Sequence, residues 1–198
     1  MQLTQGAPRR AAFTIGWFVA ILWVLEIVDA VLPARLDAYG IRPRDTGALE
    51  GIVLAPLLHL GFGHLIGNTV PLLVMGFFLA LSGLRTFVSV TAIIWLTSGI
   101  GVWVVGQGGT VHIGASGLVF GYLVHLAVRG LVTRDGAQIV LGGIMVVVYG
   151  GMLWGVLPGA VGISWEAHLF GALGGLLAAF VVPDAPRRAR REPPPAWA

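Results

Sequence analysis

A single serine lies between glycines at the start of a long apolar segment, in the stretch Gly114-Ala115-Ser116-Gly117. A serine hydroxyl is a poor nucleophile unless a neighbouring base takes its proton. A polar hydroxyl at the start of an apolar segment long enough to span a membrane suggests a chemical role. We therefore expect Ser116 to be a nucleophile and look elsewhere in the chain for its base.

The candidate base is His168, which shares a helix face with Gly171 and Gly175 at spacings of three and seven residues. Small residues at this spacing let a neighbouring helix backbone come close. Gly117 would supply the matching surface beside Ser116. Imidazole has a suitable pKa for taking a hydroxyl proton. Plain helix packing also explains the glycines, and both interpretations hold together.

Two further polar side chains, His64 and Asn68, are four residues apart and share one face of a helix. Such groups cost free energy inside a membrane unless they meet partners or water. Both offer N–H donors. Hydrogen bonding between helices is the alternative use. His59 lies nearer the interface, where an orienting role fits best.

A metal site is a rival use of His59, His64 and His168. The chain has no HExxH motif, and Glu166 is the one acid near these histidines. We therefore expect neither a metal nor a cofactor. His112 and His125 look uninvolved.

Composition indicates a membrane protein. The 198 residues are 57% hydrophobic and 11% charged, whereas soluble domains carry about 25% charged residues. The net charge is +3, but all basic residues are arginine and several cluster in one tail. Such clusters report topology rather than nucleic-acid binding. The chain contains no cysteine, which excludes disulfides and thiolate metal sites.

The hydropathy pattern predicts an all-α membrane protein with a bundle of six transmembrane helices and a membrane-associated first loop at 32–56. The expected spans are 11–31, 57–81, 86–105, 115–131, 137–157 and 165–182. Residues 1–10 would form a cytoplasmic tail, 11–183 the membrane domain, and 184–198 an Arg- and Pro-rich cytoplasmic tail without order.

The arginines predict the orientation. With a cytoplasmic N-terminus, nine arginines lie inside and three outside, which favours six spans with both termini cytoplasmic. The polar clusters near His59, Ser116 and His168 then all fall at the outer ends of the second, fourth and sixth spans. Three polar clusters at one membrane level predict one site that opens to the outer face of a bacterial plasma membrane.

Three motifs in this order resemble the rhomboid family of intramembrane serine proteases: His59-xxxx-His64-xxx-Asn68, Gly114-Ala115-Ser116-Gly117, and His168-xx-Gly171-xxx-Gly175. The resemblance covers about residues 11–183 and suggests a minimal six-span form. Many relatives carry a Trp-Arg pair in the first loop, and the segment at 50–55 has neither residue.

The resemblance implies a serine endopeptidase with a Ser116–His168 dyad. Asn68, His64 and the Ser116 backbone N–H would form the oxyanion hole, worth about 3–4 kcal/mol per donor. Phe120 would stack on His168, and His59 would support the corner before the second span. Substrates would be single-span membrane proteins, cleaved near the outer face. The oligomeric state stays open.

Two other classes compete with an enzyme. A binding module related to such proteases would lack a catalytic residue, and none is missing. A small transporter would place ionisable residues at mid-membrane, and the deep parts of the second to sixth spans contain essentially none. A serine-reactive probe would separate the enzyme from both.

Overall fold

The structure is a computed structural model that describes residues 6–32, 35–159 and 162–183. The described chain is helical, with one isolated β-bridge between Ile41 and His112, so the all-α prediction is confirmed. The long helices are α1 (Ala7–Val31), α3 (Phe62–Ala80), α4 (Leu84–Val105), α5 (Ser116–Thr133), α6 (Gly136–Tyr149) and α7 (Trp165–Val181). Half of the expected N-terminal tail, 1–5, and all of the expected C-terminal tail, 184–198, lie outside the described residues, while α1 begins at Ala7, four residues before the expected span.

Short helical turns occupy the connections. Four of them lie in the first loop and one follows α6. They are η1 (Leu36–Tyr39), η2 (Thr46–Ala48), α2 (Gly51–Leu54), η3 (Ala55–Leu57) and η4 (Gly150–Val156).

Among the described residues, five helical segments are long and apolar enough to cross a bilayer: α1, α3, α4, α5 and α6 together with η4. Helix α7 is apolar but has 17 residues, at the short end of the range that spans a membrane. The chain is thus a multi-pass membrane protein. The count of six spans remains a prediction.

The expected second span, 57–81, begins too early. Helix α3 starts at Phe62, after an irregular segment in which Leu58 is extended and Gly61 has φ of 83°. A positive φ is costly for residues with a Cβ, so the chain turns at a glycine before the helix begins. His59 consequently lies in a loop, whereas His64 and Asn68 share α3 as predicted.

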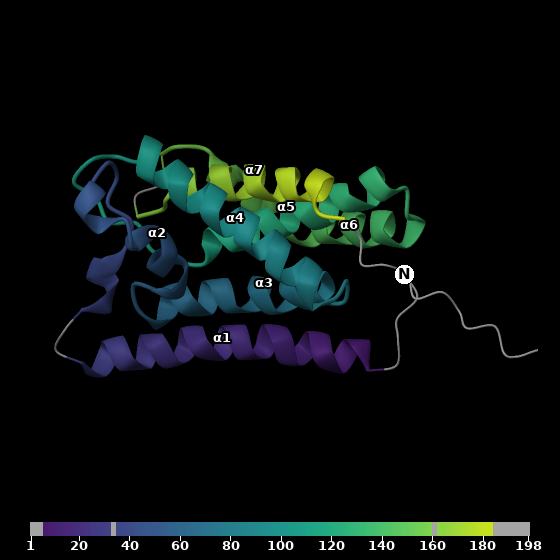
Figure 1. Ribbon diagram of the computed structural model, residues 1–198, viewed down its shortest axis with the longest axis horizontal. Coiled ribbons are helices and arrows are strands. Elements are labelled where there is room, and N and C mark those ends of the chain that lie inside the picture. Colours follow the sequence, from purple (N-terminus) through teal and green to yellow (C-terminus); the bar gives the residue numbers. More distant parts are fainter. Residues whose placement is uncertain (1–5, 33–34, 160–161, 184–198) are drawn as a thin grey trace, which may run out of the picture.

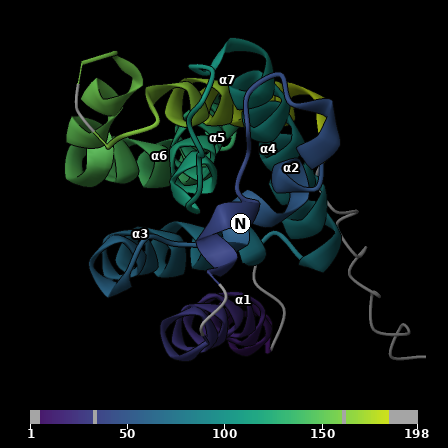
Figure 2. The ribbon, with the colours of Figure 1, turned by 90° about the vertical axis from the view of Figure 1, so that its left-hand side faces the viewer.

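Helix α5 lies at the centre of the bundle (Figures 1 and 2). It packs along α7 and α6, while α7 also packs against α4. Helix α1 lies at the edge of the bundle, on the far side of α3 from α7, and packs mainly on α3. Because α5 is enclosed by its neighbours, ten of its residues are buried. The helix that begins with Ser116 is therefore held from several sides.

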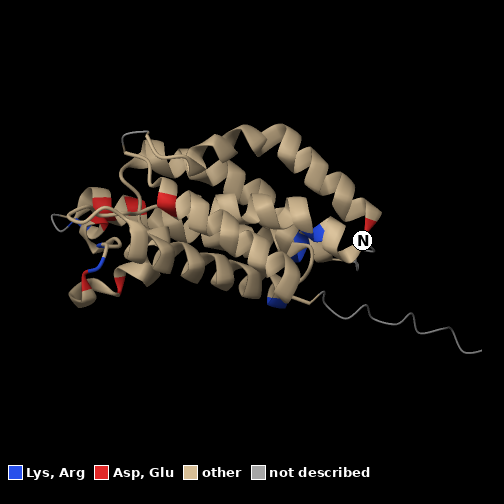
Figure 3. Cartoon of the chain, turned by 90° about the horizontal axis from the view of Figure 1, so that it is seen from above, with Lys and Arg blue, Asp and Glu red and all other residues tan. Residues whose placement is uncertain are grey.

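The outer surface of the bundle is apolar. Side chains such as Trp17 and Val147 are 69% and 85% exposed. Charged residues gather at the two ends, and the helices between them are almost free of charge (Figure 3). Large exposed apolar surfaces are unfavourable in water. This distribution fits helices surrounded by lipid, with polar groups at both membrane faces.

The first loop is fastened to the C-terminal end of α4 and to the loop that precedes Ser116. Ile41 and His112 exchange two backbone hydrogen bonds of 2.9 and 3.0 Å. The Arg44 guanidinium donates to the carbonyl oxygens of Val104 and Gly106, at 3.0 and 2.8 Å. These contacts make the first loop part of the support for the candidate site.

Candidate active site

Ser116 is the first residue of α5, and the preceding turn exposes its hydroxyl. Gly114 has φ of 119°, which a residue with a Cβ rarely adopts. The Gly114 N–H donates to the Ala55 carbonyl at 2.8 Å, which fixes the turn against the first loop. Ser116 is half-buried. Its backbone N–H belongs to the first turn of a helix, where N–H groups have no intrahelical acceptor.

His168 lies in the first turn of α7 and contacts Ser116 on the neighbouring helix α5. Its Nε2 is 2.9 Å from the Ser116 Oγ. Its Nδ1 is 2.9 Å from the carbonyl oxygen of Gly155, in η4. A carbonyl oxygen only accepts, so Nδ1 carries the proton in this contact. In the neutral ring, Nε2 then presents a lone pair to the serine hydroxyl. This is the tautomer required of a general base.

Glycines bring α5 and α7 into direct backbone contact. A Cβ on Gly171 would overlap the carbonyl oxygen of Gly117, and a Cβ on Gly175 would overlap that of Gly121. The predicted stripe of small residues therefore packs against a matching stripe on α5. Larger residues here would separate the helices that carry Ser116 and His168.

Phe120 completes the contact between these helices. Its ring is stacked on the His168 ring, with centroids 4.0 Å apart and planes inclined by 7°. Phe120 lies one turn after Ser116 on α5 and is buried. The stack and the Gly155 carbonyl together restrict rotation of the imidazole.

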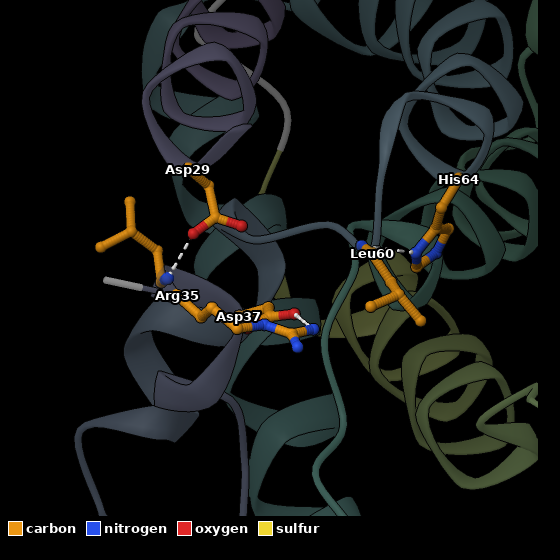
Figure 4. Close-up of polar contacts among 6 residues, drawn as sticks. Asp29, Arg35, Asp37, Leu60 and His64 are labelled. Atoms are coloured by element: carbon orange, nitrogen blue, oxygen red, sulfur yellow. Dashed lines mark hydrogen bonds and ion pairs between the residues drawn. The ribbon is translucent and has the colours of Figure 1, made fainter. Parts of the chain in front are cut away.

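His64 lies on the other side of the turn before Ser116. Its Nδ1 accepts a hydrogen bond from the Leu60 backbone N–H at 3.4 Å (Figure 4). The neutral ring then carries its proton on Nε2. A Cβ on Gly114 would lie 2.7 Å from this Nε2, so the ring packs directly against the turn. His64 thus offers an N–H donor beside the start of α5.

Asn68 lies one turn further along α3 and is 6% exposed. Its Nδ2 is buried and has no hydrogen-bond partner among the described residues. A buried amide donor without a partner costs free energy. A water molecule, or a bound group that accepts the hydrogen bond, would remove this cost.

His59 supports the turn from beneath. Its Nε2 accepts a hydrogen bond of 3.3 Å from the Ala115 backbone N–H. Its ring also packs edge-on against His64, with centroids 5.1 Å apart. Burial, and secondarily the neighbouring His64, lowers the pKa of His59 to about 4. The ring is therefore neutral at pH 7 and able to accept.

Sequence reasoning missed two contacts beside this site. His112, which looked uninvolved, bonds to Thr110 and Ser164 through its two ring nitrogens. Ser98 donates to the Ala167 carbonyl at 2.9 Å, next to Gly117. The nearness of His112 to Ser116, four residues apart in the sequence, was the local signal that could have drawn attention to it. Nothing in the local sequence pointed to Ser98.

The described part of the chain holds no group of three or more His, Asp or Glu residues arranged to bind a metal ion. The three histidines weighed for such a site are engaged differently. His59 accepts from a backbone N–H, His64 accepts from another, and His168 bridges Gly155 and Ser116. The arrangement instead places the Ser116 hydroxyl against the Nε2 atom of His168.

Known proteins provide an independent comparison. A family model described as the Rhomboid domain matches residues 46–184. An uncharacterized protein of Mycobacterium tuberculosis is 48% identical over 185 residues, covering 89% of this chain and 77% of its own length. An uncharacterized protein of Mycobacterium leprae is 44% identical over 186 residues, covering 90% and 73%. The family match spans all three polar motifs and most of the bundle, and the chain belongs to the rhomboid family of intramembrane proteases.

Proposed function

We propose that this protein is an intramembrane serine endopeptidase in which Ser116 is the nucleophile and His168 the general base. The observation that carries the proposal is the 2.9 Å contact between Ser116 Oγ and His168 Nε2, made by the tautomer that the Gly155 carbonyl selects. This geometry meets the requirement that nucleophile and base lie within hydrogen-bonding distance.

In the first half of the reaction, the Ser116 oxygen attacks the scissile carbonyl carbon while His168 takes the hydroxyl proton. The carbonyl oxygen becomes an oxyanion. As the tetrahedral intermediate collapses, the C–N bond breaks and His168 returns the proton to the leaving amine. An acyl ester on Ser116 remains. Water then attacks this ester, His168 again takes and returns a proton, and the carboxylic product leaves.

Three N–H donors are available to the oxyanion: the Ser116 backbone N–H, Asn68 Nδ2 and His64 Nε2. The partnerless state of Asn68 Nδ2 supports this role, because the donor is already desolvated before charge develops. His64 contributes from its position against Gly114. Donors fixed in advance need no reorganisation when the substrate carbonyl becomes charged.

No carboxylate is required in this scheme. In serine proteases with a triad, an acid orients the histidine and stabilises its charged form. Here the Gly155 carbonyl takes the orienting role, and the Phe120 ring restricts the imidazole plane. We therefore assign the chemistry to a Ser-His dyad.

The substrates we propose are single-span membrane proteins, cut within or near the outer part of their membrane segment. The arginine distribution supports this orientation, with both termini cytoplasmic and the site at the outer end. A substrate helix has its backbone carbonyls bonded internally. It must unwind locally before a carbonyl reaches Ser116, so residues that weaken helices near the cut favour cleavage.

The test uses purified protein in liposomes with a reporter single-span substrate and a fluorophosphonate probe. Wild type should cleave the reporter and become labelled. Ser116→Ala should do neither, and His168→Ala should lose cleavage, with both variants folded by circular dichroism. Unchanged cleavage by Ser116→Ala would refute the proposal, as would labelling at another residue.

A further inference from the structure

His112 connects the loop that carries the nucleophile to the helix that carries the base. It lies four residues before Ser116. Its Nδ1 is 2.7 Å from the Ser164 Oγ, and its Nε2 is 2.7 Å from the Thr110 Oγ1. The ring is half-buried, and its backbone is paired with Ile41. The residue is therefore fixed at its backbone and at both ring nitrogens.

Ser164 is the N-cap of α7. Its Oγ accepts the Ala167 backbone N–H at 3.4 Å, and its carbonyl accepts the His168 backbone N–H at 3.3 Å. The N-cap fixes the first turn of a helix by satisfying N–H groups that have no other acceptor. His168 belongs to this first turn. The side chain that His112 contacts is thus the one that sets the start of the base helix.

The direction of each hydrogen bond follows from the donors available. Thr110 donates its single hydroxyl proton to the Gln107 carbonyl, at 2.6 Å. It must then accept from His112 Nε2–H. The neutral ring is left with a lone pair on Nδ1, which accepts the Ser164 hydroxyl proton at 2.7 Å; the Glu166 carboxylate, 3.4 Å from the same hydroxyl, is the more distant acceptor. Burial lowers the pKa of His112, which favours this neutral ring.

We propose that His112 is a positioning residue of the hydrolytic site: by holding the Ser164 hydroxyl, it keeps the first turn of α7 in register with the loop before Ser116, so that His168 stays within reach of the nucleophile. The inference rests on the proposed function. It concerns a contact outside the dyad and the oxyanion donors. Its effect should fall on the chemical step, because His112 touches neither Ser116 nor His168 through its side chain.

Two amide substitutions separate the two ring contacts. The side-chain oxygen of asparagine is as many bonds from Cα as Nδ1 of histidine, and the amide nitrogen of glutamine is as many bonds away as Nε2. His112→Asn therefore keeps an acceptor for Ser164 and loses the Thr110 contact. His112→Gln keeps a donor for Thr110 and loses the Ser164 contact. Comparing the two variants shows which ring contact turnover depends on, because both variants keep a polar side chain at position 112.

We expect His112→Gln to lower kcat for the reporter substrate by roughly ten-fold or more with little change in KM, since small misplacements of reacting groups are costly. His112→Asn should stay within about two-fold of wild type on the same argument. Thr91→Val is the control, because it removes a buried 2.7 Å hydrogen bond to Tyr122, which lies six residues after Ser116 on α5 and contacts neither His112 nor Ser164 by hydrogen bond. This control should lower thermal stability and leave kcat unchanged.

Hydrogen exchange at Ala167 and His168 in liposomes gives a reading that needs no turnover. Exchange should be faster than wild type in His112→Gln and near wild type in His112→Asn. Equal exchange and equal kcat in the two variants would overturn the inference. If wild type neither cleaves nor labels, the proposed function fails instead, and exchange still decides whether His112 holds α7.

A second pair covers the case in which His112→Gln does not fold. Ser164→Thr keeps the hydroxyl, whereas Ser164→Ala removes it. We expect kcat to be retained in the first variant and lowered in the second, with KM similar in both. A Ser164→Ala protein with wild-type kcat would overturn the inference.

Discussion

Gly171 and Gly117 touch through their backbones, because a Cβ on Gly171 would overlap the Gly117 carbonyl oxygen. The contact lies one turn from His168 on one helix and next to Ser116 on the other. The distance between Ser116 and His168 thus depends on a contact between two residues without side chains. In this protein, helix packing and catalytic geometry depend on the same positions.

Replacement of Gly171 by alanine should consequently reduce both activity and stability. The added methyl group pushes α7 away from α5, and a displacement of about 1 Å can cost roughly 100-fold in rate. Gly16→Ala is the matched control, since a Cβ there meets nothing within 4 Å. The rate of reporter cleavage and the melting temperature in detergent should both decrease for Gly171→Ala. Neither should change for Gly16→Ala. Wild-type cleavage by this variant would show that the close contact is dispensable.

Loss of the Asn68 amide should act on turnover rather than on binding. Its Nδ2 has no partner in the described structure, so it is free to serve an oxyanion. Removing one such donor typically lowers kcat about 10²–10³-fold. We expect Asn68→Ala to show this loss with KM nearly unchanged. Thr69→Val, on the next residue of α3, should keep kcat. A rise in KM alone for Asn68→Ala would remove this residue from the oxyanion role.

The Gly155 contact predicts a difference between two glycines of η4. A Cβ on Gly155 would lie 3.0 Å from Phe120 Cζ and 3.1 Å from His168 Nδ1, whereas a Cβ on Gly151 meets nothing within 4 Å. Gly155→Ala should shift the carbonyl that orients His168 and lower kcat at least several-fold. Gly151→Ala should not. The measurement is steady-state cleavage of the reporter by the two variants. Equal rates would contradict the orienting role of Gly155.

Acid should destabilise the fold through His59. Its pKa is lowered from 6.5 to about 4 by burial and by His64. Between these values the unfolded chain binds a proton that the native protein excludes, so the free energy of unfolding decreases as the pH falls through this window. The stabilising effect is complete above pH 6.5.

His59→Gln provides the comparison. Glutamine does not titrate and can still accept the Ala115 N–H, so the variant should show a smaller decrease of Tm between pH 7 and pH 4.5. Thermal unfolding across this range measures the slope for each protein. Identical slopes would mean that His59 is not protonated on unfolding.

Much of this arrangement follows from local sequence. Apolar length predicts the helices, because a membrane span needs a continuous run of about 20 apolar residues. The spacing of His64 and Asn68 places both on one face of α3, and the glycines after His168 indicate a close helix contact. The sequence thereby determined the class of protein and which polar residues are candidates for its site.

The exact starts of the helices and the partners of each ring nitrogen were decided by the tertiary structure. His59 leaves the predicted span because Gly61 turns the chain, and His112 is engaged because α7 brings Ser164 to it. The acceptor for His168 is a backbone carbonyl, and since every residue has one, no side-chain pattern identifies Gly155. Hydrophobic period fixes which face is buried. Only long-range packing fixes which atoms meet there.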